Sequence, residues 1–293
     1  MRKHFQWDLG TRKLTLGERT LLMGIVNVTP DSFSDGGLYL GAERAVEHAL
    51  RLLDEGADII DVGGESTRPG AAATVSVQQE LDRILPVIQG VKRARPEALV
   101  SVDTYKASVA RFAVEAGVEI VNDVSGGLWD AVMLPTLAGL PCGVVLMHMR
   151  GRPEEWRSLP PIGDALAVVQ QGLADRAQAA IATNIAHARV TLDPGFGFGK
   201  SFEENYPLLA HFERLHELGF PLLAGTSRKS FLGRTLACTF VGAVKDVPPN
   251  ERLYGTLATE TALALKSAHI IRTHDVRASH DAVRVADAIL QAT

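Results

Sequence analysis

The stretch Leu99-Val-Ser-Val-Asp-Thr-Tyr-Lys-Ala-Ser-Val-Ala-Arg-Phe-Ala-Val-Glu-Ala-Gly-Val-Glu-Ile-Val-Asn-Asp123 contains the unit from which most of the chain is built. A short apolar run, 99–103, ends in an aspartate, and a longer amphipathic segment, 106–116, follows it. A second apolar run, 119–123, again ends in polar residues. Short apolar runs are typical of strands that are buried on both faces. The stretch therefore predicts a strand, a helix and a second strand parallel to the first.

The same unit recurs along the chain. Strands are predicted over 21–28, 59–62, 99–103, 119–123, 143–147, 190–193, 222–225 and 270–273. Helices are predicted over 42–55, 77–91, 106–116, 165–182, 203–218, 253–267 and 279–290, with a shorter one after Leu128. This alternation indicates a parallel α/β fold, either a barrel or a doubly wound open sheet. Residues 5–8 and 13–16 flank a Gly-Thr-Arg turn and predict an N-terminal β-hairpin.

The composition argues against several classes of protein. A formal net charge of −4 does not suit a broad nucleic-acid-binding face. Two cysteines, Cys142 and Cys238, are too few for a disulfide framework or a four-cysteine zinc site, and they fit a reduced, cytoplasmic setting. We expect Cys142 to lie in the core and, since no run approaches about 18 apolar residues, no membrane span. Because no Pro/Ser-rich linker is found, we expect a single domain over 1–293.

Polar residues stand at the carboxyl end of every predicted strand. In a barrel these ends converge on one rim, where such enzymes place their chemistry. A lone aspartate after a strand is usually a helix cap, and Asp103 and Asp123 could each be only that. Eight polar strand ends in succession favour a shared site. They comprise Asn27, Asp61 with 63–70, Asp103, Asn122 with Asp123, His148, Asp193, 227–230, and Arg272 with His274.

A glycine-rich segment, Gly195-Phe-Gly-Phe-Gly-Lys200, superficially resembles a nucleotide-binding loop. A Walker A motif would need glycine at position 194, which is Pro194. A dinucleotide motif would need glycine at position 200, which is Lys200. The sequence therefore does not support ATP or NAD binding.

Two long motifs resemble the signatures of the dihydropteroate synthase family. They are Met23-Gly-Ile-Val-Asn-Val-Thr-Pro-Asp-Ser-Phe-Ser-Asp-Gly-Gly37 and Asp58-Ile-Ile-Asp-Val-Gly-Gly-Glu-Ser-Thr-Arg-Pro-Gly-Ala71. Shorter motifs follow in the family's order: Ser101-Val-Asp-Thr104, Asn122-Asp-Val-Ser-Gly-Gly127, Leu146-Met-His-Met149, Leu192-Asp-Pro-Gly-Phe-Gly-Phe-Gly-Lys200, Gly225-Thr-Ser-Arg-Lys-Ser230 and Ile271-Arg-Thr-His-Asp-Val276. The resemblance implies a (β/α)8 TIM barrel over about 20–290, preceded by the hairpin over about 5–16.

The resemblance also implies a reaction. The amine of p-aminobenzoate displaces pyrophosphate from 6-hydroxymethyl-7,8-dihydropterin diphosphate and forms 7,8-dihydropteroate, a step of folate biosynthesis. Mg²⁺ is the expected cofactor, a homodimer the expected assembly, and sulfonamides the expected competitors of p-aminobenzoate. Two alternatives remain: a pterin-dependent methyltransferase-type barrel and a pterin-binding protein without catalysis. The methyltransferase would need neither 66–70 nor an anion site at Arg272 and His274.

The pterin ring has adjacent N–H donors that a buried carboxylate can accept in parallel, and Asp193 is the candidate. Alone, it could be only a strand-end turn before Pro194. Lys229 can donate to the ring carbonyl or to N5. We expect further pterin contacts from Asp103, Asn122, Val124, Met147, Gly197 and Phe198.

The diphosphate requires cations. Arg272 and His274 lie two residues apart, which predicts that they point to the same side. Asn27 can add an amide contact and bind Mg²⁺, which uses few protein ligands when phosphate oxygens are present. Without these neighbours, His274 could be only a surface or capping residue. Thr67 and Arg68 complete the proposed diphosphate site.

The carboxylate of p-aminobenzoate also needs donors. We expect Ser230 to begin the segment that leads into the helix predicted over 253–267, and the start of a helix has free N–H groups that attract anions. Phe33, Pro69, Phe198 and Lys229 could enclose the aromatic ring, and the loop with Thr67 and Arg68 could order over both substrates. The predicted catalytic set is Asn27, Thr67, Arg68, Asp103, Lys229, Arg272 and His274. With no obvious general base, our hypothesis is that pyrophosphate leaves before the amine attacks.

Overall fold

The structure is a computed structural model, and it describes residues 2–29, 37–66, 75–237 and 246–292. Eight parallel strands form one sheet in the order β8-β7-β6-β5-β4-β3-β10-β9. A bridge between Leu192 and Leu222 joins the two edges, so the sheet closes into a barrel. The (β/α)8 barrel is therefore confirmed over the open sheet. The strands are β3 (Leu21–Asn27), β4 (Ile59–Gly63), β5 (Leu99–Asp103), β6 (Ile120–Asp123), β7 (Gly143–Met147), β8 (Val190–Asp193), β9 (Leu223–Ala224) and β10 (Ile270–Thr273).

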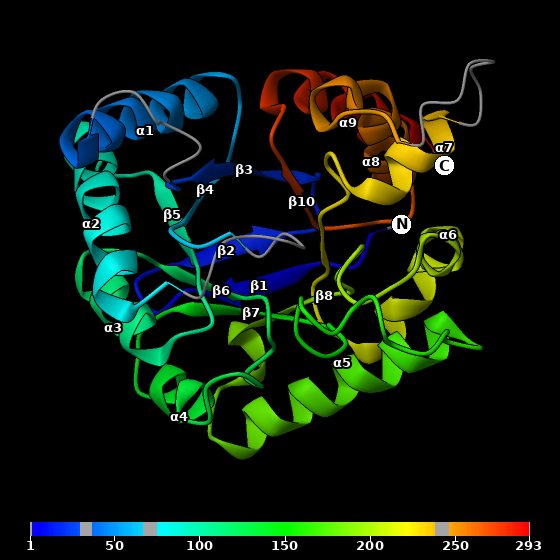
Figure 1. Ribbon diagram of the computed structural model, residues 1–293, viewed down its shortest axis with the longest axis horizontal. Helices are drawn as coiled ribbons and strands as arrows, with labels where there is room; N and C mark the ends of the chain where they lie inside the picture. The colour runs from blue at the N-terminus through cyan, green and yellow to red at the C-terminus, as the bar shows by residue number, and fades with distance from the viewer. Residues whose placement is uncertain (1, 30–36, 67–74, 238–245, 293) are drawn as a thin grey trace.

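The helices surround the strands (Figure 1). Three of them, α2, α5 and α6, begin at a side-chain cap, and in α2 Ser76 and Gln79 satisfy each other's backbone N–H groups. No helix in the described ranges is long and apolar enough to cross a membrane. The α-helices are α1 (Gly37–Asp54), α2 (Val77–Ala94), α3 (Ala107–Glu115), α4 (Met133–Ala138), α5 (Ala165–Ala182), α6 (Phe202–Ala210), α7 (Ser230–Ala237), α8 (Leu253–Leu265) and α9 (Val276–Gln291). Short 3-10 helices are η2 (His187–Arg189), η3 (Phe212–Leu218) and η4 (Pro249–Glu251).

One predicted helix, 203–218, is wrong as a continuous element. It is divided into α6 and η3, and His211 between them leaves the helical region at φ −122° and ψ 26°. Pro207 removes one backbone donor from α6 and weakens its continuation. The three-residue period of η3 then places Phe212 and Leu215 on one face, where both are fully buried.

The apolar core has two main parts. Outward-facing strand residues such as Ile60, Val100 and Ile271 pack against the helices. The interior of the barrel is filled at its amino end by a second cluster that includes Ile59, Leu99 and Ile270. The predicted hairpin, β1 (Phe5–Asp8) paired with β2 (Lys13–Leu16), supplies Trp7 and Leu16 to this interior cluster. Cys142 is buried in the core, as predicted.

Moving two residues along a strand keeps the side chain on the same face. The interior therefore changes from apolar to polar toward the carboxyl end: Ile59 is followed by Asp61, Ile120 by Asn122, and Ile270 by Arg272. The strand register also places Asn27, Gly63, Asp103 and Asn122 side by side across β3 to β6. The fold thus collects the polar strand ends in one mouth.

Candidate active site at the carboxyl end of the barrel

Arg272 of β10 lies at the centre of a buried polar network. Its Nε donates to Oδ2 of Asp61 at 2.7 Å, and its Nη2 donates to Oδ2 of Asp103 at 2.7 Å. Asn122 donates from Nδ2 to the same oxygen of Asp61 at 3.0 Å. Burial opposes the positive charge, but Asp61 and Asp103 outweigh it and hold the pKa of Arg272 above its ordinary value. The site therefore keeps a permanent cation between two carboxylates.

Burial acts in the opposite direction on the aspartates. It raises the pKa of Asp103, although the charge of Arg272 lowers it. It also raises the pKa of Asp193 to about 6, against the hydrogen bond from the backbone N–H of Gly195 and the charge of Lys229. Carboxylates with raised pKa values that are grouped beside fixed cations are candidates for a functional site.

Asp61 is a site residue to which the sequence assigned no role. Its side chain is fully buried, and its Oδ1 has no hydrogen-bond partner within the described ranges. A buried polar atom without a partner is costly, which marks a position where a ligand can bind. A signal was present, because a charged residue in the middle of an apolar strand at an inward-facing position is unusual.

Asp193 stabilises a turn and also belongs to the candidate site. The N–H of Gly195 donates to Oδ1 of Asp193 at 2.7 Å. Gly195 has φ +65°, and a Cβ there would lie 2.0 Å from the carbonyl oxygen of His148, so the turn requires glycine. The ammonium of Lys200 donates to the carbonyls of Gly195, Phe198 and His148 at 2.8, 3.2 and 3.2 Å. Burial lowers the pKa of Lys200 to about 7.

An apolar wall borders the polar network. Val124, Met147 and Met149 form a small cluster against which Phe198 packs, together with Trp129 and Trp156. The ammonium of Lys229 lies 3.7 Å from the ring centroid of Phe198. The predicted residues Val124, Met147, Phe198 and Lys229 are thus in contact or close. Met149 and the two tryptophans were missed, because the tryptophans belong to irregular loops without a periodic signal.

His274 follows β10 directly, beside the loop after β9. Its Nδ1 lies 3.0 Å from Oγ of Ser227, and its backbone N–H donates to the same Oγ at 3.2 Å. Since Oγ accepts the backbone hydrogen, the hydroxyl hydrogen can be donated to Nδ1 of a neutral imidazole. Ser230 is the first residue of α7, a helix that the sequence did not predict as a separate element.

Asn27 ends β3 and is half-buried, and the hydrogen bonds resolved among the described residues include none from its side chain. Four predicted residues, Phe33, Thr67, Arg68 and Pro69, lie outside the described residues.

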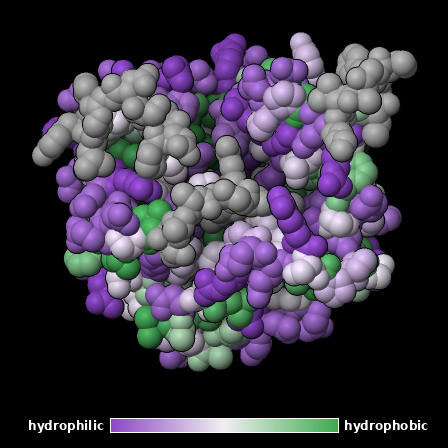
Figure 2. All heavy atoms as spheres, viewed as in Figure 1, coloured by the Kyte–Doolittle hydropathy of each residue, from purple (hydrophilic) through white to green (hydrophobic). Residues whose placement is uncertain are grey.

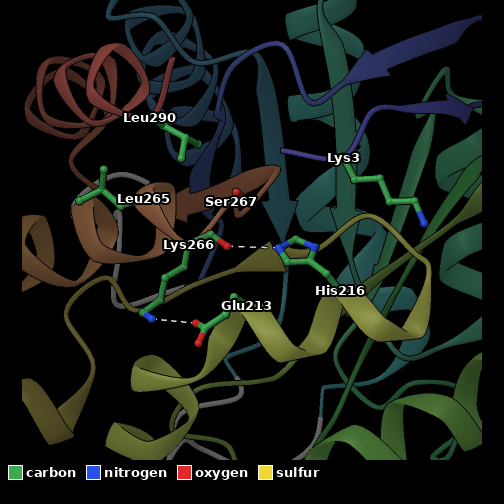
Figure 3. Close-up of a pocket in the computed structure, with 7 residues that line it drawn as sticks. All are labelled: Lys3, Glu213, His216, Leu265, Lys266, Ser267 and Leu290. Atoms are coloured by element: carbon green, nitrogen blue, oxygen red, sulfur yellow. Dashed lines mark hydrogen bonds and ion pairs between the residues drawn. The ribbon is translucent and has the colours of Figure 1, made fainter. Parts of the chain in front are cut away.

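The face in Figure 2 is largely hydrophilic around its centre. A separate hollow, drawn in Figure 3, lies near the amino ends of the strands, where Lys266 pairs with Glu213 at 2.7 Å and His216 contacts the Lys266 carbonyl at 3.1 Å. These contacts occupy the ammonium and one ring nitrogen, and the hollow is remote from Arg272. The network at the barrel mouth is therefore the candidate active site.

A family model described as pterin binding enzyme matches residues 23–274, which include the candidate site from Asn27 to His274. The dihydropteroate synthase of Escherichia coli strain K12 is 44% identical over 271 residues, 92% of each chain. The chain belongs to the dihydropteroate synthases, within the pterin-binding enzyme family.

Solved structures of this family have the same fold. A Xanthomonas albilineans dihydropteroate synthase with 4-aminobenzoic acid is 45% identical, with a TM-score of 0.87 over 99% of this chain and 100% of that one. The Xanthomonas albilineans enzyme in complex with 7,8-dihydropteroate is 42% identical, with a TM-score of 0.84 over 98% and 99%. These likenesses favour the synthase interpretation over a methyltransferase.

Proposed function

We propose that this dihydropteroate synthase chain performs its reaction at the network around Arg272. The C–O bond between the pterin methylene and the diphosphate breaks, a C–N bond to p-aminobenzoate forms, and the amine releases a proton. The observation that carries the proposal is the juxtaposition of a largely buried cation, three carboxylate acceptors and an apolar wall at one barrel mouth.

The pterin ring fits the polar interior. Asp193 can accept the paired N–H groups of the pyrimidine edge when it is ionised, and Asp103 and Asn122 can bond other ring nitrogens. Val124, Met147, Gly197 and Phe198 would contact the ring, and Lys229 would donate to its carbonyl or N5. Analogues that lack these hydrogen bonds would leave buried groups unpaired and be rejected.

The diphosphate would bind to Arg272, His274 and Asn27, with Thr67 and Arg68. A guanidinium has five N–H donors, and Asp61 and Asp103 engage two of the donor nitrogens of Arg272. The remaining donors can bind phosphate oxygens without loss of the carboxylate contacts.

Mg²⁺ fits the amide oxygen of Asn27, because this ion needs few protein ligands when phosphate oxygens complete its shell. When bound, Mg²⁺ would neutralise charge on the leaving pyrophosphate.

The carboxylate of p-aminobenzoate would bind at Ser230, where α7 begins, and the ring would lie against Phe198 and Lys229. Phe33, Thr67, Arg68 and Pro69 would cover it. Sulfonamides share the aniline and an anionic end, so they should compete with p-aminobenzoate. Inhibition that is competitive against p-aminobenzoate and not against the pterin would support this placement.

We infer that the C–O bond breaks before the amine attacks. Arg272, His274 and Asn27 stabilise the departing pyrophosphate, and the site offers preorganised charge where negative charge develops. Positional isotope exchange within the diphosphate in the absence of p-aminobenzoate would support this order. No exchange, with cleavage strictly dependent on p-aminobenzoate, would indicate direct displacement.

The deciding experiment measures pyrophosphate release with the pterin diphosphate, p-aminobenzoate and Mg²⁺. Formation of dihydropteroate in equal amount is expected, and both signals should stop when p-aminobenzoate or Mg²⁺ is omitted. Tight pterin binding without turnover would instead identify a binding protein without catalysis.

We also infer a cytoplasmic homodimer that uses the faces of the last two helices, α8 and α9. Tyr254 on α8 is 82% exposed, and Val285 and Ile289 on the neighbouring α9 are 61% and 51% exposed. Several large exposed apolar side chains on adjacent elements are typical of association surfaces. Light scattering at micromolar concentration should give twice the chain mass, and Tyr254→Asp should shift it toward the monomer.

A further inference from the structure

An ion pair joins the two loops that carry the candidate ligands of the pterin and of the diphosphate. Arg228 lies in the loop after β9, between Ser227 and Lys229, and Asp275 follows His274 after β10. Nε of Arg228 donates to Oδ2 of Asp275 at 3.0 Å, and Nη2 donates to Oδ1 at 2.5 Å. This two-point geometry fixes orientation as well as distance, because the guanidinium and the carboxylate are both planar.

The backbone of Arg228 is held as firmly as its side chain. Its φ is +59°, in the left-handed region that side chains other than glycine rarely adopt. Its N–H donates to Oγ1 of Thr256 at 3.0 Å, and its carbonyl accepts from Nη1 of Arg252 at 2.7 Å. Residues with a strained backbone that several neighbouring contacts hold in place are concentrated at functional sites.

The residues next to this ion pair in the sequence are Lys229 and His274, two candidate site residues. Lys229 lies over Phe198, on the proposed pterin side of the site, whereas His274 follows Arg272 by two residues, on the proposed diphosphate side. The ion pair is one residue from each of these two groups. A substrate that spans both sides requires them at a set separation, and a misplacement of about 1 Å can cost on the order of 100-fold in rate.

We infer that Arg228 is a positioning residue for the reaction. Its bridge to Asp275 sets Lys229 relative to His274, so that the pterin ring and the diphosphate are held at the same time. This inference rests on the proposed function, since it assumes a substrate that spans both loops. It does not require Arg228 to touch the substrate.

The chain contains a matched control for the same chemistry. Arg19 and Asp58 form another two-point pair, at 2.9 and 2.5 Å, just before β3 and β4 at the opposite end of the barrel. Both arginines are partly exposed, with 32% of the side chain accessible in Arg228 and 54% in Arg19. Arg19→Lys therefore tests the loss of a comparable bridge away from the site.

The experiment compares Arg228→Lys, Asp275→Asn and Arg19→Lys in the full chain. Pyrophosphate release should fall about 10- to 100-fold for the first two and less than about twofold for Arg19→Lys. The double variant R228K/D275N should be no worse than either single variant, because the two residues act as one unit. Arg228→Gly, which suits a positive φ, should fall as far as Arg228→Lys, because it keeps the backbone and loses the bridge.

Calorimetry separates positioning from general damage. Binding of 6-hydroxymethylpterin alone and of pyrophosphate with Mg²⁺ alone should change less than about threefold in Arg228→Lys, since each probe touches one side only. Normal turnover in either Arg228→Lys or Arg228→Gly would overturn the inference. It would also be overturned if Arg228→Lys lost affinity for both probes and Arg19→Lys lost it equally. If the wild-type protein releases no pyrophosphate, the proposed function itself fails.

Discussion

The two ends of the barrel shift the pKa values of their buried carboxylates in opposite directions. At the amino end, burial would raise the pKa of Glu119, but hydrogen bonds from Arg12, Thr11 and Lys92 outweigh it and hold the pKa at about 2. At the carboxyl end, burial prevails and raises the pKa of Asp193 to about 6 and that of Asp103 as well.

This difference in pKa indicates what the carboxylates at each end of the barrel do. Both carboxylate oxygens of Glu119 at the amino end accept hydrogen bonds within the chain, so its charge stabilises the fold. At the mouth, Oδ1 of Asp61 is buried and has no partner among the described residues. A polar group that is buried without a partner lowers the stability of the fold, but it can still form a hydrogen bond to a ligand. A binding site can in this way lose stability and gain function. Substitutions at matched positions should separate the two roles.

Arg272→Ala should have the largest effect. It removes the proposed diphosphate cation and leaves Asp61 and Asp103 without their counter-charge, so pyrophosphate release should fall on the order of 1,000-fold or more. Arg12→Ala, which removes a cation at the other end, should change turnover less than about threefold. Near-normal turnover of Arg272→Ala under saturating substrates would remove Arg272 from the site.

Asp103→Asn should lower activity while preserving or raising stability. Turnover should fall roughly 100-fold, because a pterin contact and the partner of Arg272 are lost. The pKa of Asp103 in the folded protein lies above the unfolded value of 3.8. The free energy of unfolding therefore decreases as pH rises from 3.8 to the folded pKa, because the unfolded state loses its proton first. The variant should therefore gain about 1–2 kcal/mol in urea unfolding at pH 8, and less at pH 5. Destabilisation at pH 8 would contradict the comparison.

Glu119→Gln should do the reverse. The folded pKa of about 2 lies below the ordinary 4.5, so the stabilisation is complete above about pH 4.5 and disappears as pH falls toward 2. We expect a loss of roughly 2–3 kcal/mol in the free energy of unfolding at pH 7 with turnover unchanged. A loss of turnover in the folded variant would mean that the two ends are coupled.

Pterin binding should depend on the ionisation of Asp193. The ionised carboxylate accepts the ring N–H groups, so affinity for 6-hydroxymethylpterin should fall about tenfold per pH unit below about pH 6 and level off above pH 7. Asp193→Asn should bind more weakly and with a flatter profile in calorimetry, whereas Glu119→Gln should keep the wild-type profile. A flat wild-type profile between pH 5 and 7 would exclude Asp193 as the acceptor.

Trp7→Phe should give the smallest change. The indole Nε1 donates to the carbonyl of Arg189 at 2.8 Å, and phenylalanine would keep the apolar contact but lose this bond. Unfolding in urea should show a loss of about 1 kcal/mol, with turnover unaffected. A larger loss would indicate that the hairpin contributes more to the amino end than its packing suggests.

The sequence by itself determined the strand–helix alternation and the polar carboxyl ends of the strands. These are local properties, because a period of two or of 3.6 residues reports which face of an element is buried. It also identified Asp103, Asn122, Asp193 and Arg272 correctly as residues of one mouth. It missed the interruption at His211, where packing of Phe212 and Leu215 prevails over a continuous helical pattern.

Only the tertiary structure decided how these residues are paired. Arg272 is 211 residues from Asp61 and 169 from Asp103, and no local pattern specifies partners across such distances. Closure of the barrel between Leu192 and Leu222, and the bridge between Arg228 and Asp275, likewise join segments that meet only in the folded chain. The charge that each group carries follows from burial and neighbours, and these exist only once the barrel has closed.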